Sequence, residues 1–205
     1  MSDETLVKFG SPTLAGLKTG NIFTCEYTDL HELSGQLRDL NRKLVPRGLR
    51  LIPLRWSKKR VLLYLYRPDR LEKDLAGEEA RDLLNQEGYS DRNSEYCLLE
   101  LIRRLRGRKA FPHEIGLFLS YPPEDVRGFI RYGGSRSKLT GCWQVYGDAE
   151  AARKTFERFD KCTRIYCRSR GRRQDRFRVR RGGRRFLRRH RFRMPRYGRG
   201  SSGRK

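Results

Sequence analysis

Leucines recur at spacings of three and four along residues 29–44, and this pattern predicts a helix with one apolar face. The leucines of that face are Leu30, Leu33, Leu37, Leu40 and Leu44. Two short β-type runs follow at residues 49–54 and 60–66, and the basic turn between them predicts a hairpin. Pro53 has no N–H to give to a neighbouring strand, so the first strand belongs at a sheet edge or at a bulge.

The middle of the chain carries helical patterns with recognisable ends. A polar helical pattern follows Pro68 and stops at Gly88, with Gly77 as a break within it. Asn93 and Ser94 suit the start of the next helix. The expected buried face of that helix consists of Tyr96, Leu99, Ile102 and Leu105.

The last part of the body mixes strand and helix patterns. Residues 114–121 are apolar enough to predict a central strand, and the double proline after them predicts a helix over residues 125–132. Residues 142–146 alternate like a strand, and Asp148 caps a helical pattern over residues 149–167. About four strands and five or six helices predict a mixed α+β domain, with a small sheet covered by helices.

Charge divides the chain into two parts. Residues 168–205 contain 17 arginines, one lysine and one aspartate, a formal charge of +17, whereas the preceding 167 residues carry 30 basic and 23 acidic side chains. A body of that length can bury a core of its own, so we expect one globular domain over residues 1–167. Few apolar groups and strong self-repulsion predict that the basic tail, residues 168–205, is disordered.

Arginines and aromatic rings alternate along this tail. Guanidinium groups displace counterions from phosphates, and aromatic rings stack on unpaired bases. The tail therefore predicts salt-sensitive, low-specificity binding to RNA or DNA. The candidate contacts are Arg172, Arg173, Arg180, Arg181, Arg184, Arg185, Arg188 and Arg189. An arginine-only bias also arises without selection in a GC-rich reading frame, so a frameshifted end stays open as a second account of the tail.

The chain has no pattern typical of a membrane or secreted protein. No apolar run approaches the roughly 18 to 20 residues that cross a bilayer, and the first ten residues mix charged with apolar side chains. We therefore expect a soluble, cytoplasmic protein with no membrane partner. Its oligomeric state is left open by the sequence.

The cysteines are odd in number and spread through the body, which favours reduced thiols over a disulfide framework. They are Cys25, Cys97, Cys142, Cys162 and Cys167. Cys162 and Cys167 are spaced by more than one helical turn, and no paired CxxC motif is present. The spacing therefore predicts no metal site, and small buried apolar groups are the expected role.

One pair of residues is a candidate for catalysis. His113 and Glu114 lie at the mouth of the predicted central strand, with Lys18 and Tyr121 as expected neighbours. The pair lacks the second histidine of a zinc-protease motif and lacks a recognisable nucleophile. We therefore expect a binding or accessory protein rather than an enzyme, with no cofactor assignable. An enzyme or a metal- or redox-linked protein with a pocket at this pair is the alternative.

A glycine-rich segment near the N-terminus resembles a phosphate-binding loop but departs from it. Five residues separate Gly10 from Gly16, and Leu17 intervenes before Lys18, whereas a P-loop has four residues and then lysine directly. The segment favours a turn followed by a helix that starts at Pro12-Thr13.

Five segments in the same order resemble a bacterial family of unknown function, the domain-of-unknown-function family 3793. They are residues 11–23, 40–54, 62–75, 111–130 and 143–166. The resemblance implies almost nothing about activity. Similar proteins tend to carry a His-Cys pair where this chain has Phe9-Gly10, which argues against a thiol-based role at that position. They also tend to stop soon after the last helix, which implies that the basic tail is peculiar to this chain.

Overall fold

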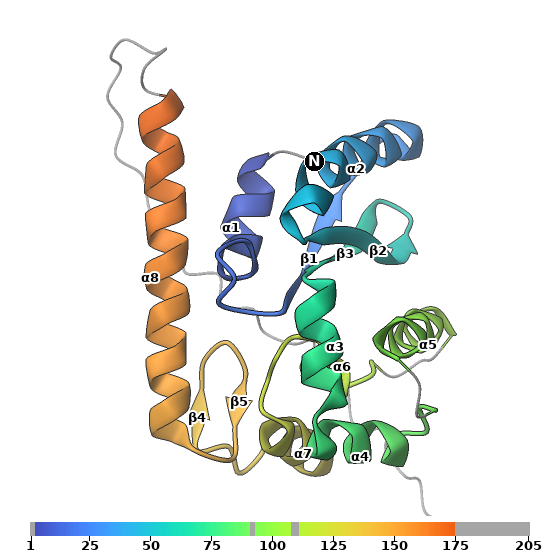
Figure 1. The fold of residues 1–205 in the computed structure, drawn as a ribbon, viewed down its shortest axis with the longest axis vertical. Helices are drawn as coiled ribbons and strands as arrows, with labels where there is room; N and C mark the ends of the chain where they lie inside the picture. The colour runs from blue at the N-terminus through green and yellow to red at the C-terminus, as the bar shows by residue number, and fades with distance from the viewer. Residues whose placement is uncertain (1–2, 91–92, 108–110, 175–205) are drawn as a thin grey trace, which may run out of the picture.

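A small antiparallel sheet with helices on both faces forms the centre of the molecule, and one long helix stands along its side (Figure 1). The computed structural model describes residues 3–90, 93–107 and 111–174. The helices are α1 (Asp3–Leu14), α2 (Leu30–Leu44), the 3-10 helix η1 (Val45–Arg47), α3 (Pro68–Ala76), α4 (Glu78–Gln86), α5 (Ser94–Gly107), α6 (Ile115–Phe118), α7 (Pro123–Tyr132) and α8 (Ala149–Gln174). The strands are β1 (Gly20–Glu26), β2 (Arg50–Ser57), β3 (Arg60–Tyr66), β4 (Leu139–Thr140) and β5 (Gln144–Val145).

The three-stranded sheet has the order β1-β3-β2, with both pairs antiparallel. The expected hairpin is confirmed as β2 and β3. Strand β2 lies at the edge, and its register shifts between Pro53 and Arg55, so Pro53 combines the edge and bulge positions that suit a proline. Strand β1 was missed by the sequence pattern, since Ile22 and Phe23 are its only large apolar residues.

Alternate residues of the sheet enter two apolar cores. On β3, Val61, Leu63 and Leu65 face α1 and α2, whereas Tyr64 and Tyr66 face the core built with α3 to α7. A third, smaller cluster joins the β4–β5 hairpin to α8 through residues such as Trp143, Val145, Ala152 and Phe159. The predicted mixed α+β class, a small sheet covered by helices, is confirmed.

The central strand expected over residues 114–121 is wrong, because this segment forms the single helical turn α6 and a loop. Every residue from Glu114 to Leu119 is buried. Ile115, Leu117, Phe118 and Leu119 all enter the core shared with α3 and α5. A short segment that is apolar throughout has no periodicity with which to tell a buried strand from a buried helix.

The expected starting point of the first helix is also wrong. Helix α1 begins at Asp3, and Pro12 lies in its last turn instead of opening a helix. A proline there cannot donate to the Lys8 carbonyl and its ring crowds that carbonyl, so it weakens the last turn of α1 close to where the helix ends. Gly16, with φ of +72°, ends α1: its N–H donates to the Thr13 carbonyl, and the Leu17 N–H donates to the Pro12 carbonyl. This is the hydrogen-bond pattern of a Schellman motif.

Of the buried face expected for the helix after Asn93, Leu105 is confirmed, whereas the rest of the buried face is displaced by about one residue. In α5 the buried apolar residues are Cys97, Leu98, Leu101 and Leu105. Tyr96 and Leu99 are 50% and 62% exposed instead. Both sets have helical spacing, so contacts with α3 and the sheet decide which set is buried. The expected break at Gly77 is confirmed, since α3 ends before it and α4 begins after it.

Helix α8 begins at the predicted cap, where the Asp148 carboxylate accepts bonds from the Glu150 and Ala151 N–H groups. It continues past residue 167 to Gln174, so residues 168–174, including the positions of Arg172 and Arg173, are helical. The disorder expected for residues 175–205 falls outside the described residues, as do the predicted contacts Arg180, Arg181, Arg184, Arg185, Arg188 and Arg189. None of the described helices combines the length and apolar character needed to span a membrane.

Candidate functional site

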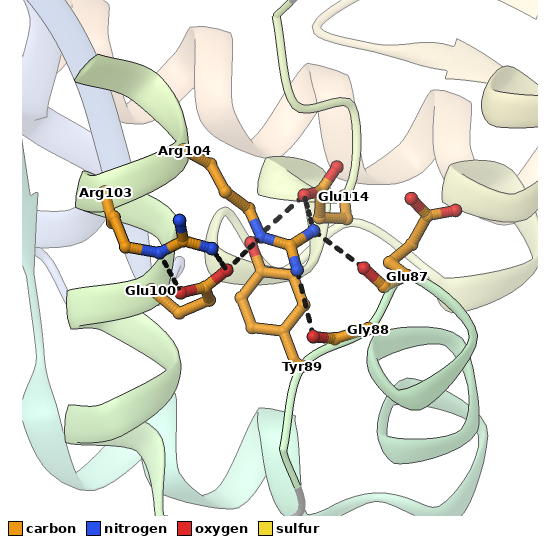
Figure 2. Close-up of polar contacts among 7 residues, drawn as sticks. All are labelled: Glu87, Gly88, Tyr89, Glu100, Arg103, Arg104 and Glu114. Carbon is orange, nitrogen blue, oxygen red and sulfur yellow. Dashed lines mark hydrogen bonds and ion pairs between the residues drawn. The ribbon is translucent and has the colours of Figure 1, made fainter. Parts of the chain in front are cut away.

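The carboxylate of Glu114 lies inside a closed polar cluster between α4, α5 and α6 (Figure 2). Its Oε1 atom is 3.2 Å from Arg104 Nη1 and accepts a hydrogen bond of 3.1 Å from the Tyr89 hydroxyl. The Arg104 and Glu114 side chains are both only 3% exposed. Burial and the nearby Glu114 charge raise the Tyr89 pKa, so the phenol keeps its proton and donates to the carboxylate.

Arg104 satisfies its remaining donors within the same cluster. It donates to the Glu87 and Gly88 carbonyls at 2.7 and 3.1 Å and to Glu100 at 2.6 Å, and its guanidinium lies 4.0 Å from the centre of the Tyr89 ring (Figure 2). Within the described part of the chain, no buried side-chain nitrogen or oxygen lacks a hydrogen-bond partner. The cluster therefore joins the end of α4 to α5 and α6. The Glu114 carboxylate is part of these structural contacts.

His113 is exposed and packs against two aromatic rings outside this cluster. Its ring packs edge-on against Phe129 at 4.9 Å and tilted against Phe111 at 6.4 Å. Partial burial lowers the pKa of the imidazole. Among the described residues, no hydrogen bond, ion pair or ring contact joins His113 or Glu114 to the other two candidates, Lys18 and Tyr121.

Lys18 and Tyr121 do lie together, at a junction of four segments. The Lys18 Nζ atom is 4.9 Å from the centre of the Tyr121 ring and 5.9 Å from that of Phe159 on α8. Gly16 ends α1 and turns the chain toward this junction. The Thr19 N–H then donates to the Ser120 hydroxyl at 3.0 Å, which holds the loop before β1 against the loop after α6.

The close approach of these two loops depends on local backbone features. A Cβ on Gly20 would lie 2.3 Å from the Tyr64 ring and 2.8 Å from the Phe118 carbonyl oxygen, so the position accepts only glycine. Ser120 has φ of +53°, which is uncommon for a residue other than glycine. This turn places Tyr121 against Trp143, with ring centres 4.8 Å apart.

Cys142 borders the same junction from the β4–β5 hairpin. The Tyr121 hydroxyl donates to the Cys142 carbonyl oxygen at 3.4 Å, and the charges of Lys18 and Cys142 each shift the pKa of the other. We call Lys18, Tyr121, Cys142, Trp143 and Phe159 the Lys18 site. Cys142 is exposed overall, although packing around its thiol raises the thiol pKa.

Lys18 is an unusual residue for an apolar junction. The residue is 5% exposed, and no hydrogen bond or ion pair reaches its ammonium group from any described residue; because no fully buried side-chain nitrogen in this part of the chain lacks a partner, the Nζ atom itself meets solvent. Burial lowers its pKa to about 8. Only the aromatic faces and the small solvent exposure of the residue compensate the ammonium charge, whereas buried charges are usually paired with an opposite charge. A strongly shifted, unpaired lysine is a mark of functional sites.

The sequence pattern indicated Lys18 and Tyr121 as candidates but not Cys142 and Trp143 as their neighbours. These residues lie more than 100 positions from Lys18 along the chain, and β4 and β5 are two residues long each. Nothing in the sequence next to Lys18, between Leu17 and Thr19, indicates this contact. The contact itself depends on the docking of α8 and the hairpin.

The thiols do not gather into a metal site. All five are free: Cys25, Cys97 and Cys162 are buried, and Cys142 and Cys167 are exposed. Among the described residues, no three His, Cys, Asp or Glu side chains are placed to hold one metal ion. The three buried cysteines are packed in the cores as small apolar groups, which matches their expected role, whereas Cys142 and Cys167 are not.

A basic surface forms the second half of α8. From Ala149 to Asp160 the helix has three basic and three acidic residues, whereas from Lys161 to Gln174 it has six basic residues and no acidic one. Lys161, Arg164 and Arg168 are exposed on one face, and Cys162 is the last buried residue of the helix up to Ser169, where the description of its side chains ends. Figure 1 shows the C-terminal end of α8 standing beyond α1.

A family model described as "Protein of unknown function (DUF3793)" matches residues 6–177, which is most of the chain. The chain belongs to the DUF3793 family. The matched region includes the sheet, all three apolar cores and the whole of α8. The match also covers every residue of the Lys18 site and of the Arg104–Glu114 cluster. No curated protein and no solved structure matches the chain.

Proposed function

We propose that this DUF3793 protein is a binding or accessory protein that attaches to nucleic acid through a basic arm, residues 161–205. The observation that carries the proposal is the change of charge along α8, from balanced in its first half to wholly basic in its second. The arm then continues into residues 175–205, which add 14 basic side chains and one acidic one.

The chemistry of the arm favours phosphate groups as its target. Lys161, Arg164 and Arg168 lie at successive turns of one helix face, and none of them is held in an ion pair within the described residues. Exposed guanidinium groups gain most of their binding free energy by releasing counterions from phosphates. Contacts of this kind do not distinguish bases, so the expected binding has low sequence specificity.

The geometry favours this role over catalysis at His113 and Glu114. The Glu114 carboxylate is already paired with Arg104, accepts a hydrogen bond from Tyr89 and is only 3% exposed, so a substrate could not easily reach it. The His113 ring is directed at Phe129. The proposal places the protein in the cytoplasm, where nucleic acid is available and free thiols persist.

Charge reversal on α8 tests the proposal. Arg164→Glu with Arg168→Glu should weaken binding of a fluorescein-labelled single-stranded RNA by about tenfold or more at 0.1 M salt, because two phosphate contacts become repulsive. Fluorescence anisotropy measures the dissociation constant. Both side chains are exposed, so the thermal unfolding temperature should stay the same.

A matched control separates a specific surface from total charge. Lys58→Glu with Lys59→Glu changes the net charge equally at the exposed β2–β3 turn, on another part of the molecule. We expect this variant to bind RNA nearly as well as the unaltered protein. Equal losses in the two variants would show that the overall charge matters and the α8 surface does not, and the proposal would then be wrong.

A further inference from the structure

A cluster of aromatic rings and arginines lies where α7 meets the β4–β5 hairpin. Tyr132, the last residue of α7, stacks on Tyr146, which directly follows β5, with ring centres 5.9 Å apart and 28° between the ring planes. The guanidinium groups of Arg131 and Arg136 lie over the Tyr132 ring, 5.3 and 5.2 Å from its centre. We call these four residues the Tyr132 platform.

The turn after α7 holds Arg136 at the platform. Gly133 ends the helix in the left-handed region, with φ of +57°. The Ser135 N–H and hydroxyl both donate to the Tyr132 carbonyl, at 3.0 and 2.6 Å. Arg136 has φ of +61°, which is uncommon for a residue other than glycine. The turn therefore brings Arg136 back to the tyrosine that ends the helix.

The platform belongs to a segment that carries only positive charge. Residues 126–147 contain four exposed basic side chains and no acidic one, and these are Arg127, Arg131, Arg136 and Lys138. No ion pair joins any of the four to another described residue, and the Arg131 and Arg136 guanidinium groups have no hydrogen bond there either. Tyr132 itself is partly exposed. An accessible aromatic ring is thus combined with unpaired cations.

We infer that the Tyr132 platform is a base-stacking site, which makes the protein prefer single-stranded over duplex nucleic acid. A cation over an exposed ring is held weakly, so an unpaired base can displace one guanidinium group from the Tyr132 ring. The freed arginine then binds the phosphate beside that base. In a duplex the bases are paired and stacked on one another, so they gain nothing from the ring.

This inference rests on the proposed function, because the basic arm supplies most of the attraction to phosphates. The two surfaces are nevertheless distinct. The β4–β5 hairpin packs against the first half of α8 through Ala152 and Phe159, whereas the arm begins at Lys161 (Figure 1). The arm attracts the phosphates of any nucleic acid, whereas stacking distinguishes unpaired from paired bases. Single-stranded and duplex RNA therefore separate the two contributions.

The test compares a fluorescein-labelled single-stranded RNA with the duplex that it forms with its complement. Tyr132→Leu in the full chain should weaken binding of the single strand by about fivefold or more and leave duplex binding unchanged, because stacking is lost and charge is not. Tyr132→Phe keeps the ring and should bind both RNAs like the unaltered protein. Tyr96→Leu, at an exposed tyrosine on α5, should also have no effect. Fluorescence anisotropy measures the dissociation constants.

An unchanged affinity of Tyr132→Leu for the single strand, or an equal loss on both RNAs, would overturn the platform. The arm is tested separately, since Arg164→Glu with Arg168→Glu should weaken both RNAs alike. No loss in that double variant would refute the arm, while a selective loss in Tyr132→Leu would still support the platform.

A second measurement applies if Tyr132→Leu lowers the unfolding temperature. Ultraviolet cross-linking of the unaltered protein to the single-stranded RNA, followed by peptide mass spectrometry, identifies the rings that contact bases. RNA attached to Tyr132 supports the platform. RNA attached only to other aromatic residues, or no binding of RNA at all, would exclude it.

Discussion

Lys18 reduces the stability of the fold that surrounds it. A lysine whose pKa falls on folding favours the unfolded state at neutral pH, because there the ammonium is fully hydrated. The faces of Tyr121 and Phe159 return only part of the lost hydration free energy. A lysine that destabilises an otherwise apolar junction is better explained by a functional role of its amine than by a structural role.

Substitution of Lys18 by methionine should therefore stabilise the protein. Methionine fills a similar volume without a charge, so we expect the free energy of unfolding at pH 7 to rise by about 1 to 3 kcal/mol. In the unaltered protein stability should increase with pH between about 8, the folded pKa, and the ordinary lysine range near 10.5. Urea unfolding at several pH values measures both effects. A Lys18→Met protein that is less stable at pH 7, or that keeps the same slope above pH 8, would contradict this account.

Among the elements, α4, α5 and α6 are joined by Arg104. The guanidinium bridges the end of α4, through the Glu87 and Gly88 carbonyls, to Glu114 beside α6. Loss of one member of a buried ion pair leaves the other charge without compensation. The cluster is thus expected to act as one cooperative unit.

Substitution of Arg104 by methionine should destabilise the protein by about 3 to 5 kcal/mol, because the Glu114 carboxylate would be left buried and unpaired. The adjacent Arg103 offers a matched control: it also pairs with Glu100, but its side chain is 73% exposed. Arg103→Met should cost far less than Arg104→Met, because water screens the exposed Arg103–Glu100 pair. Chemical denaturation of both variants gives the comparison, and equal losses would show that the cluster has no special role.

The sequence pattern predicted those elements whose signals are local. The α2 stripe, the β2–β3 hairpin with Pro53, the Gly77 break and the Asp148 cap all depend on residues close together in the chain. The pattern failed where packing decides. Helix α6 is apolar on every side, and α5 has two candidate apolar faces, so only tertiary contacts determine their structure.

The candidate sites show the same division. Lys18 and Tyr121 were named from their residue types. Cys142 and Trp143 reach Tyr121 only because the β4–β5 hairpin packs against the loop that follows α6. Arg104 was missed altogether, since an arginine in the last turn of a polar helix is usually a solvated residue. Arg104 is buried because the chain after α5 places Glu114 against it.

At the scale of the whole molecule, the charge distribution separates a folded domain from a basic arm. Phe159 is the last residue along the chain in the three apolar cores, and the DUF3793 match ends at residue 177. The arm therefore contributes little to the cores. Removal of residues 175–205 should leave the domain folded, with an unchanged unfolding temperature, while removing most of the positive charge.

The salt dependence of RNA binding tests the central claim most directly. For the full chain, the logarithm of the affinity for single-stranded RNA should fall against the logarithm of salt concentration with a slope of about −4 or steeper, as expected for six or more phosphate contacts. A chain ending at Gln174 should bind more weakly, with a slope nearer about −2, because fewer basic residues remain. Equal affinities and equal slopes for the two chains would contradict the proposal that the arm binds nucleic acid.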